Sequence, residues 1–173
     1  MNHLGTKAFR LLSMGLLPVA FIACSQQEIE NPAADVTGFD YDTSLAMTNL
    51  MTMVIEPAAD SLWDNAGWIE SAAGYEELYP TTEEGWEFVE AQAALVAESG
   101  NLLALPGRAV DDDAWLIYSA GLVEAGRMAM DAAERRHQED FFQAGAQIYS
   151  VCRACHQSYN PDIVSRFVDG EPQ

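Results

Sequence analysis

The chain carries four amphipathic stretches in which apolar residues recur every three or four positions. This period matches the α-helix, which has about 3.6 residues per turn, rather than the strict alternation of a strand. The first stretch has apolar residues at Met47, Met51, Val54, Ala58 and Leu62. It predicts a helix that begins near Ser44 and is kinked near Ile55–Glu56, because Pro57 cannot donate an amide hydrogen bond.

The second stretch predicts a helix that begins at Thr81, where Thr81 and Glu84 fit a capping box. Gly100 and Asn101 are expected to end this helix, since both residue types favour helix C-termini. Its inward positions are Trp86, Val89, Ala93 and Val96.

The third stretch follows the acids at 111–113, which are favourable beside a helix N-terminus. Its inward positions are Trp115, Tyr118, Leu122, Ala125, Ala129 and Ala132. The fourth stretch is predicted from about Gln138 to Tyr159, and Asn160-Pro161 should stop it, because the residue before a proline disfavours helical backbone. Its inward positions are Phe141, Gly145, Ile148, Cys152, Cys155 and Tyr159.

No segment alternates with the period of a strand, so no β-hairpin is expected. The sequence therefore predicts an all-α domain over 44–161, an antiparallel up-down-up-down four-helix bundle. The connections 69–80 and 101–110 are expected to pack on it through Tyr75, Tyr79, Leu102, Leu103 and Leu105. The tryptophans are expected in the core; they are Trp63, Trp68, Trp86 and Trp115.

The N-terminal segment has the order of an export signal. Lys7 and Arg10 precede the apolar run 11–23, and no acid occurs before Glu28. This run is shorter than the roughly 20 residues that span a bilayer. Residues 1–23 are therefore predicted to be a signal peptide.

The cleavage site indicates how the mature chain is held. Residues Phe21-Ile22-Ala23-Cys24 resemble the lipobox of bacterial lipoproteins, which implies a lipid anchor on Cys24 at the periplasmic side of a bacterial membrane. Cleavage by the ordinary signal peptidase is the alternative. Ser25 is not the Asp that retains lipoproteins at the inner membrane in some bacteria, which favours the outer membrane. Residues 24–43 are predicted to be a flexible acidic tether, and 162–173 a C-terminal tail.

The charge of the chain bears on its partners. It has 27 acidic and 8 basic residues, a formal net charge of −19, which argues against nucleic acid as a partner. Removal of the signal takes Lys7 and Arg10, which leaves 6 basic residues and a formal charge of −21. A partner protein is therefore expected to dock with a basic surface.

The chemistry-bearing motif is Cys152-Arg153-Ala154-Cys155-His156, the C-x-x-C-H signature of covalent haem attachment. Residues three apart share a helix face, so both thiols can bond to the vinyl groups of one porphyrin. His156 can then bind the iron as the proximal ligand. The sequence predicts one covalently attached haem c, directed into the interior by the apolar face of the fourth helix.

Two other chemistries use similar residues. A thioredoxin-type C-x-x-C needs a βαβ context, which the pattern does not contain. A zinc site needs about four ligands, and the mature chain adds only His137 to Cys152, Cys155 and His156.

A C-x-x-C-H motif close to the C-terminus, after three other helices, resembles the class II c-type cytochromes, which include cytochrome c′ and its low-spin relatives. The resemblance covers 44–161, and its specific element is 152–156. It implies a left-handed four-helix bundle with Cys152 and Cys155 as thioether anchors and His156 as the fifth ligand. Members of this family are often dimers, so a homodimer is kept as an alternative to a monomer.

The sixth ligand decides the function. The start of the first helix should lie beside the end of the fourth, which brings Met47 and Met51 to the level of His156, whereas Met53 points elsewhere. Low-spin members of the family bind iron through a Met of the first helix, and Leu50-Met51 resembles that helix. The resemblance implies Met51 as the distal ligand, with Met47 as the second choice; alternatively, both fill the core.

The predicted function is that of an electron carrier, not an enzyme, which cycles Fe(II)/Fe(III) with redox partner proteins. The alternative is a five-coordinate cytochrome c′-like protein that binds NO or CO. A haem peroxidase is disfavoured because no distal His–Arg pair is recognisable in the sequence.

Overall fold

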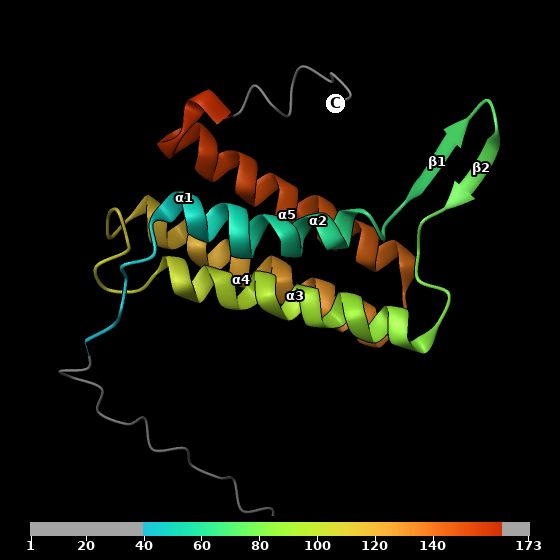
Figure 1. Cartoon of the computed structure of the whole chain (residues 1–173), viewed down its shortest axis with the longest axis horizontal. Coiled ribbons are helices and arrows are strands. Elements are labelled where there is room, and N and C mark those ends of the chain that lie inside the picture. The colour runs from blue at the N-terminus through green and yellow to red at the C-terminus, as the bar shows by residue number, and fades with distance from the viewer. Residues whose placement is uncertain (1–39, 164–173) are drawn as a thin grey trace, which may run out of the picture. The chain divides into compact units, whose positions relative to one another are not determined.

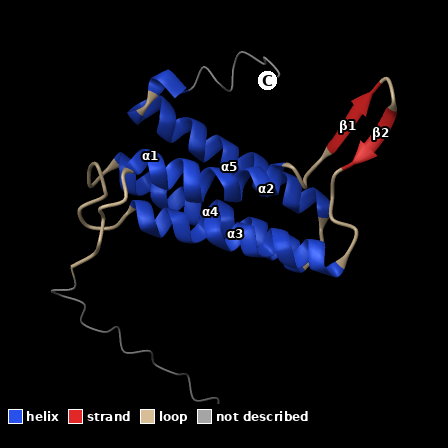
Figure 2. Ribbon diagram, viewed as in Figure 1, coloured by secondary structure: helices blue, strands red, loops and turns tan. Residues whose placement is uncertain are grey.

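The computed structural model describes residues 40–163, and this part of the chain is mainly helical (Figures 1 and 2). Its elements in chain order are α1 (Met47–Leu50), the π-helical turn η1 (Met51–Ile55), α2 (Glu56–Trp63), β1 (Trp68–Ser71), β2 (Gly74–Glu77), α3 (Glu83–Leu103), α4 (Ala114–Glu134), α5 (Gln138–Tyr159) and the 3-10 turn η2 (Pro161–Ile163). The elements α1, η1 and α2 follow one another without a break. The described part therefore contains the four helical stretches that the periodicity predicts, and its class is all-α.

The helices pack side by side around one apolar core. Helix α4 contacts α3 and α5, and α2 likewise contacts α3 and α5. The largest fully buried apolar side chains are Leu50, Leu62, Val89, Val96, Phe141 and Ile148. The inward positions predicted on the second helix are all buried, and so are those on the third apart from Tyr118. Burial thus follows the same period from which the helices were predicted.

Small residues let α3 and α4 approach closely. A Cβ atom on Gly126 would lie 2.5 Å from the backbone nitrogen of Ala97, and a Cβ on Gly100 would lie 2.5 Å from the carbonyl oxygen of Ser119. Either distance is far inside van der Waals contact, so neither position has room for a larger residue. The expectation that Gly100 ends the helix is wrong, because α3 continues to Leu103. The glycine instead serves the contact between the helices.

The perturbation predicted near Ile55–Glu56 is confirmed, and it takes the form of a π-helical turn. The amide of Glu56 donates to the carbonyl of Met51, five residues earlier, directly before Pro57. The wider turn lets Leu50 and Ile55, five positions apart, both face the core. The predicted apolar face is wrong in this respect, because it omitted both residues.

The hairpin of β1 and β2 contradicts the expectation that the chain contains none. Its antiparallel strands are exposed throughout, so neither carries the alternation by which a half-buried strand is recognised. The expectation that Trp68 lies in the core is wrong, because its side chain is 54% exposed, and Tyr75 is 61% exposed. Trp68 stacks on Phe142 of α5 at a ring distance of 5.9 Å, and Tyr79 packs against the core as expected. Figure 1 shows the hairpin extending away from the helices.

Helix boundaries differ by a few residues from the predicted ones. The first helix begins at Met47 rather than near Ser44. The cap of α3 is Thr82 rather than Thr81, and its hydroxyl accepts a hydrogen bond from the amide of Gly85 at 3.1 Å. The bounds predicted for the last helix, Gln138 to Tyr159, are confirmed.

Several predictions concern residues outside the described range. These are the signal peptide, the anchor Cys24, the part of the tether before residue 40 and the tail from residue 164 onward. Among the described residues, no helix is long and apolar enough to cross a membrane.

Candidate functional site

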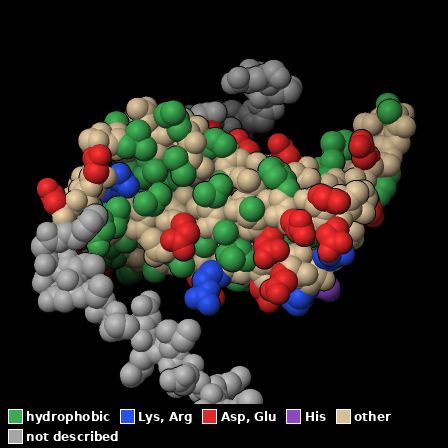
Figure 3. Space-filling model, turned by 60° about the horizontal axis from the view of Figure 1, so that its bottom comes forward, with side chains coloured by type: hydrophobic (Ala, Val, Ile, Leu, Met, Phe, Trp, Pro, Cys, Tyr) green, Lys and Arg blue, Asp and Glu red, His purple; other side chains and the backbone are tan. Residues whose placement is uncertain are grey.

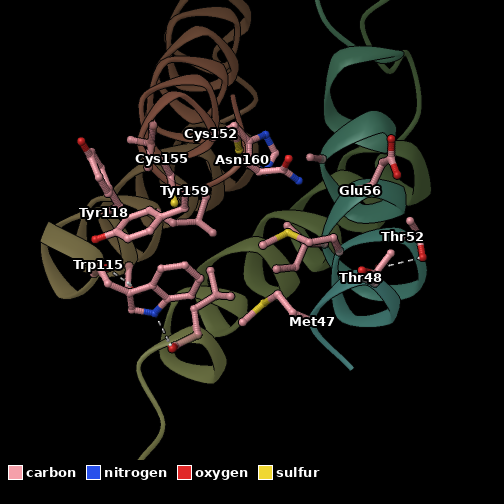
Figure 4. A pocket seen from close by; sticks show the side chains of 18 of the residues that line it. Met47, Thr48, Thr52, Glu56, Trp115, Tyr118, Cys152, Cys155, Tyr159 and Asn160 are labelled. Carbon is pink, nitrogen blue, oxygen red and sulfur yellow. Dashed lines mark hydrogen bonds between the residues drawn. The ribbon is translucent and has the colours of Figure 1, made fainter. Parts of the chain in front are cut away.

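The first helical stretch, α4 and α5 enclose a cavity of about 360 Å³ (Figure 4). This volume lies within the range of about 300–1,000 Å³ that is typical of small-molecule and cofactor sites. The lining is mostly apolar and aromatic, with the carboxylates of Glu56 and Asp60 among its few charged groups. Because the first helix and α5 form opposite walls, residues that are distant in the sequence, such as Met51 and Cys152, line the same cavity.

The wall formed by α5 carries the C-x-x-C-H motif. Cys152, Cys155 and His156 all line the cavity, and Figure 4 shows both cysteines on this helix at its border. Both cysteines are free thiols, and they pack against the core while remaining partly accessible. The prediction that the helix directs both thiols inward is confirmed by this placement.

Burial sets the protonation of this wall. It raises the pKa of Cys152 to about 11, with a further contribution from Cys155. Burial likewise raises the pKa of Cys155, and the Asp111 carboxylate raises it further. The pKa of His156 is lowered by burial, against a smaller opposing effect of Glu56. Near neutral pH the site therefore holds two thiols and a neutral imidazole, the form of His that binds metals.

The imidazole also has unused hydrogen-bonding capacity. Its Nδ1 atom is buried and has no hydrogen-bond partner within residues 40–163. Buried polar atoms in native proteins are nearly always paired, so an unpaired one calls for an explanation such as an ion or ligand. The ring is thus neutral and half-buried, and its Nδ1 lacks a hydrogen-bond partner beside the two thiols.

The opposite wall carries the methionines predicted as distal ligands. Met47 of α1 and Met51 of η1 both line the cavity and are half-buried, and Figure 4 shows Met47 across the cavity from α5. Met53, in contrast, is 69% exposed, as expected. The structure therefore brings Met47, Met51 and His156 to one space. Which methionine is the sixth ligand, if either is, stays a prediction.

Aromatic side chains form the remaining wall. Trp115 donates from Nε1 to the carbonyl of Leu103 at 2.8 Å and packs edge-on against Tyr159 at a ring distance of 5.0 Å. The hydroxyls of Tyr118 and Ser158 are hydrogen-bonded at 3.0 Å. Figure 4 shows the three aromatic rings grouped on one side of the cavity.

Asp111 links this wall to α5 in a way that the sequence did not reveal. Its carboxylate accepts a hydrogen bond from the hydroxyl of Tyr159, 48 residues away, in addition to those from the amides of Trp115 and Asp113. The acids at 111–113 predict a helix start, and nothing in the sequence pairs Asp111 with Tyr159.

His137 and Arg153 do not line the cavity. His137 is exposed and caps α5, because its Nδ1 accepts a hydrogen bond from the amide of Asp140 at 3.2 Å. Arg153 is exposed between the two cysteines. Within the described range, no three His, Cys, Asp or Glu side chains are grouped so as to hold a metal ion, so the zinc alternative gains no support.

The residues present fit a haem c. Such a group needs two thiols three residues apart on one helix face, an adjacent imidazole and an apolar space beside them. The α5 wall supplies the first two, and the cavity supplies the third. Comparison with known proteins adds nothing to this, since no family model, curated protein or solved structure matches the chain.

Proposed function

We propose that the chain is a four-helix-bundle cytochrome that carries single electrons through one covalently attached haem c. The observation that carries this proposal is the cavity itself. Cys152, Cys155 and His156 on one wall, and Met47 and Met51 on the other, line the same mainly apolar space. A C-x-x-C-H sequence that arose by chance would not be expected to lie opposite two methionines across one cavity.

Each residue has a defined task in this proposal. Cys152 and Cys155 would hold the porphyrin through thioether bonds, and His156 would bind the iron from the α5 side. Met51, or else Met47, would bind it from the first helix and exclude exogenous ligands. When bound, the haem would supply a one-electron Fe(II)/Fe(III) couple, whose potential Met ligation raises. The apolar and aromatic walls would keep water from the ligand atoms.

The protein surface supports exchange with basic partners. Figure 3 shows many acidic and few basic side chains on the face that it views, in line with 27 acidic and 8 basic residues in the chain. A field of this sign speeds association with positively charged proteins and is screened by salt. We propose that the redox partners dock through basic surfaces.

The proposal includes export and anchoring. Residues 1–23 would direct the chain across the inner membrane, and Cys24 would carry the lipid that holds it at the periplasmic side, with the outer membrane favoured. Covalent haem attachment takes place outside the cytoplasm in bacteria, so both inferences require the same compartment. Lipid chains attached to Cys24 anchor a protein stably without a membrane-spanning helix.

The first experiment tests attachment. The full chain is expressed in a bacterium with and without its haem c maturation system, and the denatured protein is examined by mass and by haem absorption. We expect one haem per chain in the first case only, and none in a Cys152→Ser/Cys155→Ser variant. A redox titration of the loaded protein should then follow a single one-electron curve. A wild-type chain that never retains haem on denaturation would refute the proposal.

The alternative function is a five-coordinate protein that binds NO or CO. It would leave Met47 and Met51 as core residues and would give a loaded protein that takes up CO as soon as it is reduced. A Met-ligated iron would react with CO slowly, because the thioether must first leave.

A further inference from the structure

Asp111 lies where two helices of the site meet. One of its carboxylate oxygens accepts hydrogen bonds from the amides of Trp115 and Asp113, each at 3.0 Å, and so caps the start of α4. The other oxygen accepts a hydrogen bond from the hydroxyl of Tyr159 at the end of α5. One half-buried side chain therefore joins the N-terminus of α4 to the last turn of α5.

Tyr159 holds this turn from the cavity side. It lies one helical turn after Cys155, lines the cavity and packs its ring edge-on against the buried Trp115. The last turn also contains His156, whose carbonyl accepts a hydrogen bond from the amide of Asn160 at 2.8 Å. Movement of Tyr159 would therefore be transmitted to the residues that bind the haem.

The charge of Asp111 persists near neutral pH. Its pKa is lowered, chiefly by the hydrogen bond from Tyr159 and then by those from Trp115 and Asp113. The same hydrogen bond is the main reason why the pKa of Tyr159 is raised to about 12. The pair is thus an ionised carboxylate and a neutral phenol.

From this geometry we infer that Asp111 and Tyr159 are positioning residues for the haem-bearing end of α5. Their hydrogen bond fixes the turn that carries Cys155 and His156. The Asp111 carboxylate places a negative charge beside the attachment site and favours the oxidised iron, and the Tyr159 hydroxyl attenuates that charge by donating to it. This inference rests on the proposed function.

The two halves of the pair should shift the reduction potential in opposite directions. Asp111→Asn removes a negative charge, so reduction becomes easier and the potential should rise. Tyr159→Phe removes the donor and leaves the charge in place, so the potential should fall. We expect the Asn variant to change the equilibrium constant for electron exchange by about tenfold, which is 59 mV for one electron.

A matched control separates this from the general effect of charge. Asp112 is the next residue, is exposed and can be changed to Asn with the same loss of charge. Asp112→Asn should shift the potential in the same direction as Asp111→Asn but by much less, because water screens an exposed charge. Equal shifts in the two Asn variants, or shifts of the same sign in Asp111→Asn and Tyr159→Phe, would overturn the electrostatic part.

A second measurement tests the hydrogen bond in the chain without haem. Amide hydrogen exchange at residues 156–160 should be faster in Asp111→Asn and Tyr159→Phe than in the wild type, and unchanged in Asp112→Asn. Unaltered exchange in the first two would overturn the positioning role. If the chain never takes up haem, the proposed function fails, whereas this exchange measurement still decides whether the pair fixes the end of α5.

Discussion

The contact between α3 and α4 and the space between the first helical stretch and α5 are built from opposite kinds of side chains. Along α3 and α4 the facing residues are small, among them Ala97, Gly100 and Gly126, and the backbones touch. Between the first helix and α5 the facing residues are thiols, methionines and aromatic rings, and a cavity of about 360 Å³ remains. The contact between α3 and α4 leaves no room for a ligand, whereas the space between the first helix and α5 is large enough to accept one.

We expect the contact between α3 and α4 to determine stability and the cavity to determine function. Tight packing at α3 and α4 provides dispersion contacts and excludes water without using any chemistry-bearing residue. The cavity side instead gathers the thiols, the imidazole and the two methionines around one space. Changes on the packed side should therefore act on unfolding, and changes on the cavity side on ligand chemistry.

The largest expected effect on stability comes from filling the packed side. Gly126→Ala would put a methyl group 2.5 Å from the backbone of Ala97, so the helices must move apart. Overpacking of this kind costs about 1–3 kcal/mol, measurable by chemical denaturation.

Gly121 is the matched control for that change, because it lies on the same helix. The nearest atom to a Cβ there is 3.5 Å away on Val151, an ordinary contact. Gly121→Ala should leave the free energy of unfolding unchanged or raise it by up to about 1 kcal/mol, since Ala is the better helix former. A Gly126→Ala protein as stable as Gly121→Ala would show that α3 and α4 are not closely packed.

A loss of similar size is expected where the packed side meets the cavity. Trp115→Phe removes the donor to the carbonyl of Leu103 and leaves that buried oxygen unpaired. The free energy of unfolding should fall by about 1–3 kcal/mol. Trp63→Phe removes a similar bond to the carbonyl of Gly145 in a more accessible place, and water can replace that donor. Trp115→Phe should therefore lower the free energy of unfolding more than Trp63→Phe does. A larger loss in Trp63→Phe would contradict the greater burial of the Trp115 hydrogen bond.

The smallest effect is expected at the junction of α4 and α5, at the ion pairs of Arg135 with Asp131 and Asp140, at 2.6 and 2.9 Å. These groups are exposed, and the pairs are screened by salt. Because Arg135 lowers the pKa of Asp131 below its ordinary value of 3.8, the contribution is present above that value and is lost as the pH falls through the lowered pKa.

Arg135→Gln should accordingly lower the thermal midpoint slightly at neutral pH, and the difference from the wild type should vanish in strong acid or at high salt. Arg127→Gln, at an exposed position of the same helix, is the control and should have no such pH-dependent difference. A difference that persists in acid would show that Arg135 acts through packing instead.

Local patterns predicted the helices and the shared helix face of Cys152 and Cys155. The period of Trp86, Val89 and Ala93 is a property of neighbouring residues, and so is the spacing of Cys152 and Cys155. Both are read directly because helical geometry repeats over a few positions. The placement of Met47 and Met51 opposite His156 needed one further assumption, that the first and fourth helices run antiparallel.

The features that sequence reasoning missed depend on distant partners or on exposure. The bond between Asp111 and Tyr159 joins residues 48 positions apart. From the sequence, Gly100 is interpreted as a helix C-terminus, and only its close contact with α4 explains why a glycine is needed there. The hairpin has no buried face, and it leaves no periodic signal. Tertiary contact decided the first two cases against the local preference, whereas the hairpin lacks the one-sided burial that produces a periodic signal.

The absorption spectrum of the reduced, haem-loaded protein tests the central claim most directly. A low-spin iron with His156 and a methionine as axial ligands should give a sharp α band, which Met51→Ala should abolish or weaken while leaving the haem attached. If the sharp band survives there, Met47→Ala is the variant expected to remove it. A broad high-spin spectrum in the wild type, with immediate binding of CO, would contradict electron transfer through a Met-ligated haem.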